Sequence, residues 1–331
     1  REGEMKRIKR PEDVVNSEFF QPGKRVYVSG NSATPQRLLD VLASDETIQG
    51  IELLGVLLLG DIDALFSEKT CQRITHRVIF NGHASRAATN QGYAKYQLLH
   101  LSDIPGQLRN YLKPDIVMIS VSGPDNGGNY SLGTTVEGVV AAVETAKQNG
   151  GIVIAERNAR MPFVLGCTLP AEMIDFCLDT DYPLPVTPTK PPDDAARKIG
   201  RTIARHIVSD GATLQYGIGQ VPEAVTDAIL DLGIKDLGIH TELFSDAMQR
   251  LVETGAVTNR QKGMFRGRSL TTYALGSKEL MEWLNKNPMV EFQALEKVFN
   301  PMEIGRNRRF VMILPVRRVD LSGRVALHES S

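Results

Sequence analysis

The chain of 331 residues is 42% hydrophobic and 23% charged and carries a formal net charge of −1 at pH 7. These values are ordinary for a globular protein with a large core, and the length favours two domains over one. The balanced charge argues against a dedicated nucleic-acid-binding protein, which usually has a basic excess.

Neither a membrane-spanning segment nor a signal peptide is evident. No run reaches the about 18 consecutive apolar residues that a membrane-spanning helix needs, and the basic start REGEMKRIKR has no apolar stretch behind it. Cys71, Cys167 and Cys177 form no C-x-x-C pair and leave an odd count, which favours free thiols in a reducing compartment. We therefore expect a cytoplasmic protein that binds neither membrane nor nucleic acid.

Short apolar runs alternate with helix-like patterns along the whole chain. The clearest strand-then-helix pairs are RVYVSG with TPQRLLDVLAS, DIVMISVSG with TTVEGVVAAVETAKQ, and ATLQYGIG with PEAVTDAILDLG. This alternation is typical of βαβ units and predicts an α/β protein with largely parallel sheets.

A proline-rich segment, DYPLPVTPTKPPDD at 181–194, is the clearest linker. The helix-like AARKIGRTIARHIV follows it, and either Asp193 or Asp194 would cap that helix at its start. We therefore place a domain boundary near residue 190, which gives one domain at 1–190 and a second at 191–331.

A weak internal repeat supports this division. Three identical pairs lie at one constant spacing: Gly30 with Gly217, Pro35 with Pro222, and Asp40 with Asp227. Both copies predict a strand, a glycine turn and a helix with proline at its first position, where the missing N–H is harmless. At the same spacing Glu242 falls on Gly55, so only the second copy carries a carboxylate. The alternative is chance similarity between two generic strand–turn–helix units.

The turn YGIGQVPEAV is the strongest local signal. Gly217 and Gly219 let backbone N–H groups approach a ligand, and the helix that follows adds its positive N-terminal dipole, which favours a phosphate, carboxylate or thioester oxygen. A tight turn without a ligand is the alternative. Because Pro222 stands where a dinucleotide fingerprint needs its third glycine, a nicotinamide cofactor is disfavoured.

The stretch LGIHTELFSD at 237–246 places a carboxylate in an apolar run. Read with period two, it puts Glu242 and His240 on one face of a strand, just before a helix with Ser245 as a candidate N-cap. Glu242 is then a surface glutamate, a ribose-binding acid or a nucleophile. His240 and Glu242 lack a third nearby ligand, so we expect no metal.

Together these segments resemble the acetyl-CoA hydrolase/transferase family, which includes 4-hydroxybutyrate and succinyl-CoA:acetate CoA-transferases. The resemblance runs from SGNSATPQRLLDVL through VSGPDNGGNYSLGTTVE and YGIGQVPEAV to DLGIHTELFSDAMQRLVETGAVTNRQK, and thus covers almost the whole chain. It implies two tandem open, mostly parallel-sheet lobes of the CoA-transferase (NagB/RpiA-like) type, with the second lobe truncated.

The resemblance also implies a mechanism. Glu242 would attack the thioester of an acyl-CoA and pass through an acyl-glutamyl anhydride and a glutamyl-CoA thioester. The turn formed by Gly217, Ile218, Gly219, Gln220 and Val221 would contact CoA, while His240 would either line the pocket or pack structurally. We expect the helix dipole to keep Glu242 ionised and apolar neighbours to restrict water.

No permanently bound cofactor is implied, since coenzyme A acts as a substrate beside a small carboxylic acid, and we expect a homo-oligomer such as a dimer. The alternatives are an acyl-CoA hydrolase and a catalytically impaired CoA-binding subunit. Leu314, before the segment VDLSG, stands where the family often has an asparagine that serves the oxyanion. Members of the family are usually longer, so we expect this chain to be a fragment that is inactive alone.

Overall fold

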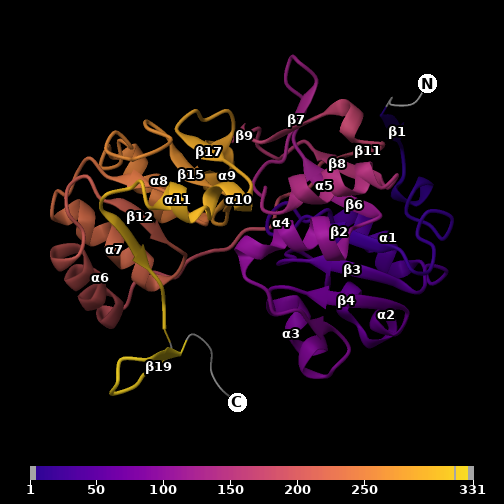
Figure 1. The fold of residues 1–331 in the computed structure, drawn as a ribbon, viewed down its shortest axis with the longest axis horizontal. Coiled ribbons are helices and arrows are strands. Elements are labelled where there is room, and N and C mark those ends of the chain that lie inside the picture. The colour runs from indigo at the N-terminus through magenta and orange to yellow at the C-terminus, as the bar shows by residue number, and fades with distance from the viewer. Residues whose placement is uncertain (1–4, 317, 327–331) are drawn as a thin grey trace.

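The computed structural model describes residues 5–316 and 318–326 of the chain. Two lobes stand side by side, and the segment between Thr180 and Asp194 joins them (Figure 1). Among the described residues, no helix is both long and apolar enough to cross a membrane.

The first lobe is built on one large sheet in which every neighbouring pair of strands is parallel. In spatial order its strands are β1 (Lys6–Ile8), β11 (Phe176–Thr180), β8 (Ile152–Asn158), β6 (Ile116–Val121), β2 (Arg25–Val28), β3 (Ile51–Gly55), β4 (Ile74–Val78) and β5 (Lys95–Tyr96). Its helices are α1 (Gln36–Ser44), α2 (Glu68–Arg73), α3 (His83–Asn90), α4 (Ile104–Gln107) and α5 (Val139–Gln148).

Helices cover both faces of this sheet. Val28 of β2 packs in one apolar cluster with Leu38 of α1, whereas its neighbour Tyr27 packs in another cluster with Val143 of α5. Because both faces are buried, the central strands are continuous apolar runs rather than alternating ones. The expectation of an α/β protein with parallel sheets is confirmed.

The second lobe contains three smaller sets of parallel strands. These are β13 (Gly238–Ile239), β12 (Thr213–Tyr216) and β18 (Phe310–Ile313); β14 (Leu243–Phe244) and β16 (Tyr273–Ala274); and β15 (Ser269–Thr271), β17 (Val290–Phe292) and β9 (Leu165–Gly166). The helices are α6 (Asp194–His206), α7 (Gln220–Asp231), α8 (Asp246–Glu253), α9 (Lys278–Leu284), α10 (Leu295–Val298) and α11 (Pro301–Ile304). Two antiparallel pairs, β7 (Asn129–Ser131) with β10 (Thr168–Pro170) and β19 (Arg318–Val319) with β20 (Val325–Ala326), complete the strands.

The helix after the linker begins as its sequence predicts. The Asp193 carboxylate accepts a hydrogen bond of 2.8 Å from the Ala196 N–H, so Asp193 rather than Asp194 is the N-cap. Gly200 of α6 lies so close to Ala224 of α7 that a Cβ there would come within 2.5 Å of the Ala224 backbone. The missing side chain therefore permits the close crossing of these two helices.

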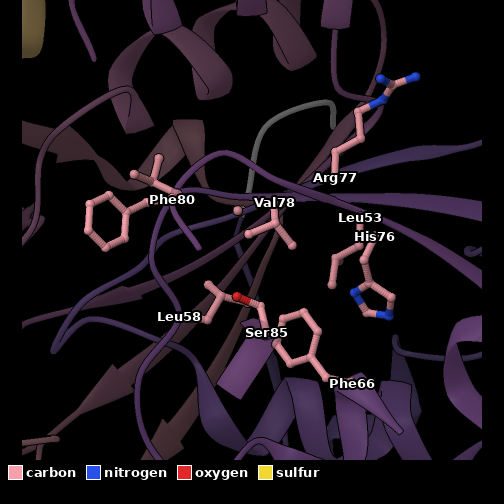
Figure 2. Close-up of a pocket in the computed structure, with 10 residues that line it drawn as sticks. Leu53, Leu58, Phe66, His76, Arg77, Val78, Phe80 and Ser85 are labelled. Atoms are coloured by element: carbon pink, nitrogen blue, oxygen red, sulfur yellow. The ribbon is translucent and has the colours of Figure 1, made fainter. Parts of the chain in front are cut away.

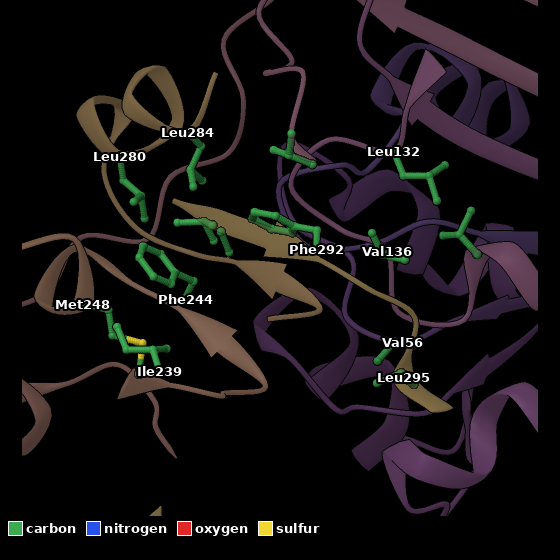
Figure 3. Close-up of a cluster of buried hydrophobic side chains, with 14 of the residues drawn as sticks. Val56, Leu132, Val136, Ile239, Phe244, Met248, Leu280, Leu284, Phe292 and Leu295 are labelled. Atoms are coloured by element: carbon green, nitrogen blue, oxygen red, sulfur yellow. The ribbon is translucent and has the colours of Figure 1, made fainter. Parts of the chain in front are cut away.

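The lobes share one apolar cluster rather than two separate cores. Val136 of the first lobe and Phe244, Phe292 and Leu295 of the second belong to this cluster, and Figure 3 shows Val136 near Phe292. Strand β9 lies before the predicted boundary near 190 and still pairs with β17. The ranges 1–190 and 191–331 remain a prediction, since segments from both sides of residue 190 build the second lobe.

Both copies of the internal repeat form a strand, a turn, a helix and a second parallel strand. In the first copy β2 pairs with β3, and in the second β12 pairs with β13. The predicted helix starts need correction, however. Pro35 is the N-cap of α1, and α7 begins at Gln220, before Pro222.

Candidate active site

The predicted strand that carries Glu242 is interrupted. Its first part, β13, pairs with β12, whereas its second part, β14, pairs with β16. Glu242 lies just before β14, at the point where the chain changes its neighbour. The expected alternation of faces is absent, because Leu237, His240 and Phe244 are all buried. Helix α8 then starts at Asp246, with Ser245 in the predicted N-cap position but without a capping hydrogen bond from its side chain.

The Glu242 side chain is half-buried and held by a tyrosine. Its Oε1 accepts a hydrogen bond of 2.8 Å from the Tyr273 hydroxyl. Its main-chain oxygen accepts a second bond of 3.0 Å from the Thr271 hydroxyl. These contacts fix both the backbone and the carboxylate. Tyr273 was not identified from the sequence, where TTYAL gives no sign that the hydroxyl would meet an acid.

Burial changes the expected charge balance at Glu242. Loss of hydration raises the pKa of the Glu242 carboxyl, and the hydrogen bond from Tyr273 lowers it and offsets part of that rise. The expectation that the α8 dipole keeps this group ionised is therefore incomplete. The Tyr273 hydroxyl is the group that favours the ionised form.

The glycine turn lies at the same edge of the sheet as Glu242. Strands β12 and β13 are parallel neighbours, and the turn follows the carboxyl end of β12 just as His240 follows that of β13. The Thr241 hydroxyl also donates to the Tyr216 main-chain oxygen over 3.4 Å, which ties the two connections together. In parallel α/β sheets, ligands bind outside the carboxyl ends of the strands.

Open space lies beside both glycines of the turn. A Cβ built on Gly217 or Gly219 would meet no atom within 4 Å. Gly219 has φ +124° and ψ 179°, a conformation that essentially only glycine adopts. Gln220 is tied to the linker, because its Nε2 donates to the Pro191 oxygen over 2.6 Å. The half-buried Ile218 and Val221 complete the turn, whose binding of CoA remains a prediction.

His240 is almost fully enclosed by protein. The side chain is 2% exposed, its Nε2 lies 2.6 Å from the Val298 oxygen, and its Nδ1 lies 3.4 Å from Asn307 Nδ2. Burial lowers the pKa of its imidazole, so the neutral form is favoured. These contacts support the structural alternative for His240 over a role in the pocket.

A second carboxyl approaches the site from the first lobe. Glu137 lies in the turn before α5 and is 1% exposed. Its Oε1 accepts a hydrogen bond of 2.9 Å from Asn31 Nδ2, and its Oε2 has no hydrogen-bond partner within the described part of the chain. Burial, followed by the charge of Glu242, raises the pKa of Glu137 to about 7. Sequence reasoning missed it, because TTVEG reads as an ordinary helix start.

Leu314 lies beside the glycine turn. It follows β18, whose last residue Ile313 pairs with Tyr216, the residue before Gly217. The Leu314 side chain is 52% exposed and offers no hydrogen-bond donor at this edge. The glycine turn therefore has an apolar neighbour, Leu314, at the position where the family often has an asparagine.

A small cavity elsewhere in the first lobe does not belong to this site. It has a volume of about 20 Å³ and is lined by residues of β3, β4 and α3, with His76, Phe66 and Ser85 around it (Figure 2). Neither Glu242 nor the glycine turn contributes to its lining. Its volume is that of about one water molecule.

Sequence profiles match most of the chain. The profile of the acetyl-CoA hydrolase/transferase N-terminal domain matches residues 2–188, and that of the C-terminal domain matches residues 276–331. The two matched segments lie on either side of the glycine turn and Glu242.

Individual relatives extend the comparison. The chain is 33% identical over 307 residues to the 4-hydroxybutyrate coenzyme A transferase of Clostridium kluyveri, an alignment that covers 91% of this chain and 69% of that protein. It is 30% identical to the succinyl-CoA:acetate/propanoyl-CoA:succinate CoA transferase of Fasciola hepatica, with 93% of this chain and 64% of that protein covered. The crystal structure of RipA from Yersinia pestis superposes with a TM-score of 0.89 at 27% identity, covering 97% of this chain and 75% of the other.

Proposed function

The chain belongs to the acetyl-CoA hydrolase/transferase family, and we propose that the full-length protein transfers coenzyme A from an acyl-CoA to a small carboxylic acid. The observation that carries this proposal is the state of Glu242. Its carboxylate is half-buried, one oxygen is fixed by Tyr273, and the glycine turn opens at the same sheet edge. A fixed carboxylate beside a cradle of backbone N–H groups suits nucleophilic attack on a thioester.

The reaction proceeds in four nucleophilic substitutions, each at the carbonyl of an acyl group or of Glu242. Glu242 attacks the acyl-CoA carbonyl, which forms an acyl-glutamyl anhydride and releases the CoA thiolate. The thiolate attacks the glutamyl carbonyl, which gives a glutamyl-CoA thioester and frees the first carboxylate. The acceptor carboxylate then displaces the thiolate to form a new anhydride. The thiolate finally attacks the acceptor's carbonyl, which yields the new acyl-CoA and regenerates Glu242. No net proton transfer is required.

The glycine turn has the geometry for holding CoA during these steps. The thiolate must stay nearby while it is detached, because the same CoA is used again in the next exchange. Backbone N–H groups at the start of α7 offer fixed donors for phosphate or carbonyl oxygens without a change of conformation. Gln220 would hold the turn in place through its bond to the linker.

Exclusion of water decides between transfer and hydrolysis. Both the anhydride and the thioester react with water, so a site that admits it would release free CoA. Around Glu242 the neighbours Leu243 and Phe244 are buried, and Tyr273 covers one carboxylate oxygen. These contacts favour transfer to an acceptor over hydrolysis.

Chemical trapping of the glutamyl thioester tests the proposal. The full-length protein is incubated with an acyl-CoA, reduced with borohydride, and digested for mass mapping. We expect a modified residue at Glu242 in the parent and none in a Glu242→Gln variant. Glu253→Gln is the matched control, because Glu253 is exposed at the end of the following helix.

Two results would contradict the proposal. Modification at another residue, or none at all, would remove Glu242 from the reaction. If acetate added before the reduction, to protein incubated with an acyl-CoA other than acetyl-CoA, led to free CoA without acetyl-CoA, the protein would be a hydrolase instead of a transferase.

A further inference from the structure

At Glu137 and its two neighbours Tyr27 and Asn31, three buried side-chain atoms of the first lobe make no hydrogen bond. These are Tyr27 Oη, Asn31 Oδ1 and Glu137 Oε2, none of which has a hydrogen-bond partner among the described residues. Burial, followed by the charge of Glu137, raises the pKa of Tyr27, and Asn31 donates directly to Glu137, so all three belong to one group. Buried polar atoms are normally paired, and unpaired ones at one place indicate a missing polar partner.

The backbone at this group is also unusual. Asn31 has φ +52° and Glu137 has φ +41°, in the left-handed region that residues with side chains rarely adopt. Such strain is retained where the surrounding structure enforces it, and it is common at ligand sites. With this backbone conformation the Glu137 side chain contacts Asn31 of the first lobe, while the Glu137 N–H contacts Thr272 of the second.

The segment that holds Glu242 also holds Glu137. The Glu137 N–H donates to the Thr272 hydroxyl over 3.0 Å, and the Val136 N–H donates to the Thr272 oxygen over 2.9 Å. The adjacent Tyr273 N–H and hydroxyl both reach Glu242, at 3.3 Å and 2.8 Å. The two carboxyls are therefore presented from opposite lobes on either side of residues 271–273. Figure 3 shows the apolar cluster beneath, where Val136 lies near Phe292.

The charge around Glu137 favours its protonated form. The titratable groups that face it are Glu242, Tyr27 and Tyr273, and the side chain that bonds it is the neutral Asn31 amide. Two nearby carboxylates cannot both ionise without a large electrostatic penalty. Tyr273 donates to Glu242 and stabilises its negative charge, so Glu137 retains the proton. This is the division into one ionised and one neutral acid that paired carboxyls commonly adopt at active sites.

We propose that Glu137, as a neutral acid, donates a hydrogen bond from Oε2 to a carboxylate oxygen of the acceptor acid while that acid approaches the carbonyl of Glu242. The inference rests on the proposed function, because it assigns a substrate group to the same site. The proton stays on Glu137 throughout, so no bond to hydrogen is broken. The protonated Glu137 hydroxyl favours a substrate group with a hydrogen-bond-accepting oxygen. An ionised Glu137 would instead repel the negative charge of the substrate carboxylate.

The pH dependence of acceptor use tests this role. With the full-length protein, propionyl-CoA as donor and acetate as acceptor, kcat/KM for acetate is measured from acidic to alkaline pH. We expect the parent to lose acetate affinity as pH rises through about 7, where Glu137 ionises. Glu137→Gln keeps an N–H donor that does not titrate, so its profile should stay flat there. Glu137→Leu removes the donor and should raise the KM for acetate by about 10- to 100-fold.

A matched control separates the role of Glu137 in acetate binding from the effect of replacing any buried carboxyl. Glu156 is also a fully buried glutamate of the first lobe with its pKa raised to about 7, but it bonds Tyr182 and the Leu38 N–H. Glu156→Gln should leave the acetate profile unchanged. As a readout that does not need activity, infrared spectroscopy of the parent below neutral pH should show the C=O stretch of a protonated carboxyl that Glu137→Gln lacks.

Several outcomes would overturn the inference. An acetate profile in Glu137→Gln that still falls through neutral pH would assign the titration to another group. Acetate affinity that rises with pH would contradict a neutral, donating Glu137, because ionisation of that carboxyl should weaken the binding of an anionic acceptor. If the parent shows no transfer that depends on Glu242, the proposed function fails and the role of Glu137 with it. If transfer depends on Glu242 but Glu137→Leu binds acetate normally, only the role of Glu137 is rejected.

Discussion

Tyr273→Phe tests how the nucleophile is kept ionised. The substitution removes only the hydroxyl that donates to Glu242 Oε1 over 2.8 Å and leaves the ring, so the buried shape is preserved. In the parent, burial raises the pKa of Glu242 and this hydrogen bond lowers it. The loss of the bond should therefore raise the pKa of Glu242 further, because the Tyr273 hydroxyl bonds the ionised carboxylate more strongly than the protonated acid.

The size of the effect follows from the strength of a charged hydrogen bond. Such a bond contributes about 1.5–3 kcal/mol, which corresponds to a decrease of about 10- to 100-fold in the population of ionised Glu242 below its pKa. The lower part of this range applies if water enters beside the half-buried carboxylate. The acidic limb of the kcat/KM profile should accordingly move to higher pH.

The assay is CoA exchange between an acyl-CoA and acetate, followed over a range of pH. Tyr182→Phe is the matched control, since Tyr182 makes the same kind of bond, 2.6 Å to Glu156, away from this site. An acidic limb that stays in place in Tyr273→Phe would refute the reasoning. An equal shift of the acidic limb in Tyr182→Phe would mean that the shift reflects a loss of protein stability and not a change in the pKa of Glu242.

Three further expectations concern binding and stability. Gly217→Ala should leave the unfolding temperature unchanged while it raises the KM for acyl-CoA, whereas Gly30→Ala should destabilise the protein by about 1–3 kcal/mol, because its Cβ would lie 2.4 Å from the Leu57 oxygen. Asp193→Ala should lower the free energy of unfolding by about 1 kcal/mol in urea titrations, and Asp194→Ala, which removes no cap, should have a much smaller effect. The pKa of Glu156 rises from 4.5 to about 7 on folding, so the native state binds more protons than the unfolded state and stability falls as pH rises through that interval; Glu156→Gln should reduce this fall in thermal unfolding.

Local patterns were sufficient to predict the elements that depend on neighbouring residues. The parallel first-lobe sheet follows from apolar runs alternating with helices, and the start of α6 follows from Asp193 after a proline-rich linker. Element boundaries were less secure, as the early start of α7 shows. The strand through Glu242 failed as an alternating strand, because its pairing partners change from β12 to β16 and both faces are buried.

The parts of the site that sequence reasoning missed depend on contacts between distant segments. Tyr273 and Glu137 are 31 and 135 residues away from the residues whose atoms they bond, Glu242 and Thr272 respectively. Positive φ at Glu137 leaves no trace in TTVEG, since a glutamate before Gly138 is common in helix starts. Lys262 is a further residue whose environment its neighbours do not reveal: it lies in the basic stretch NRQKGMFRGR, yet it is fully buried and donates to the Arg268 oxygen over 2.7 Å.

The two copies of the repeat differ in whether the glycine turn is filled by the chain itself or faces open space. In the first copy, Gly30 lies against the Leu57 oxygen, and the Asn31 N–H donates to that oxygen over 2.6 Å, so the chain itself fills its glycine turn. In the second copy, Gly217 faces open space and its backbone is free to meet another molecule. The carboxyl end of β3 carries Gly55, whereas Glu242 follows β13. The same strand–turn–helix unit thus serves as packing in one lobe and, by our proposal, holds CoA beside a nucleophile in the other.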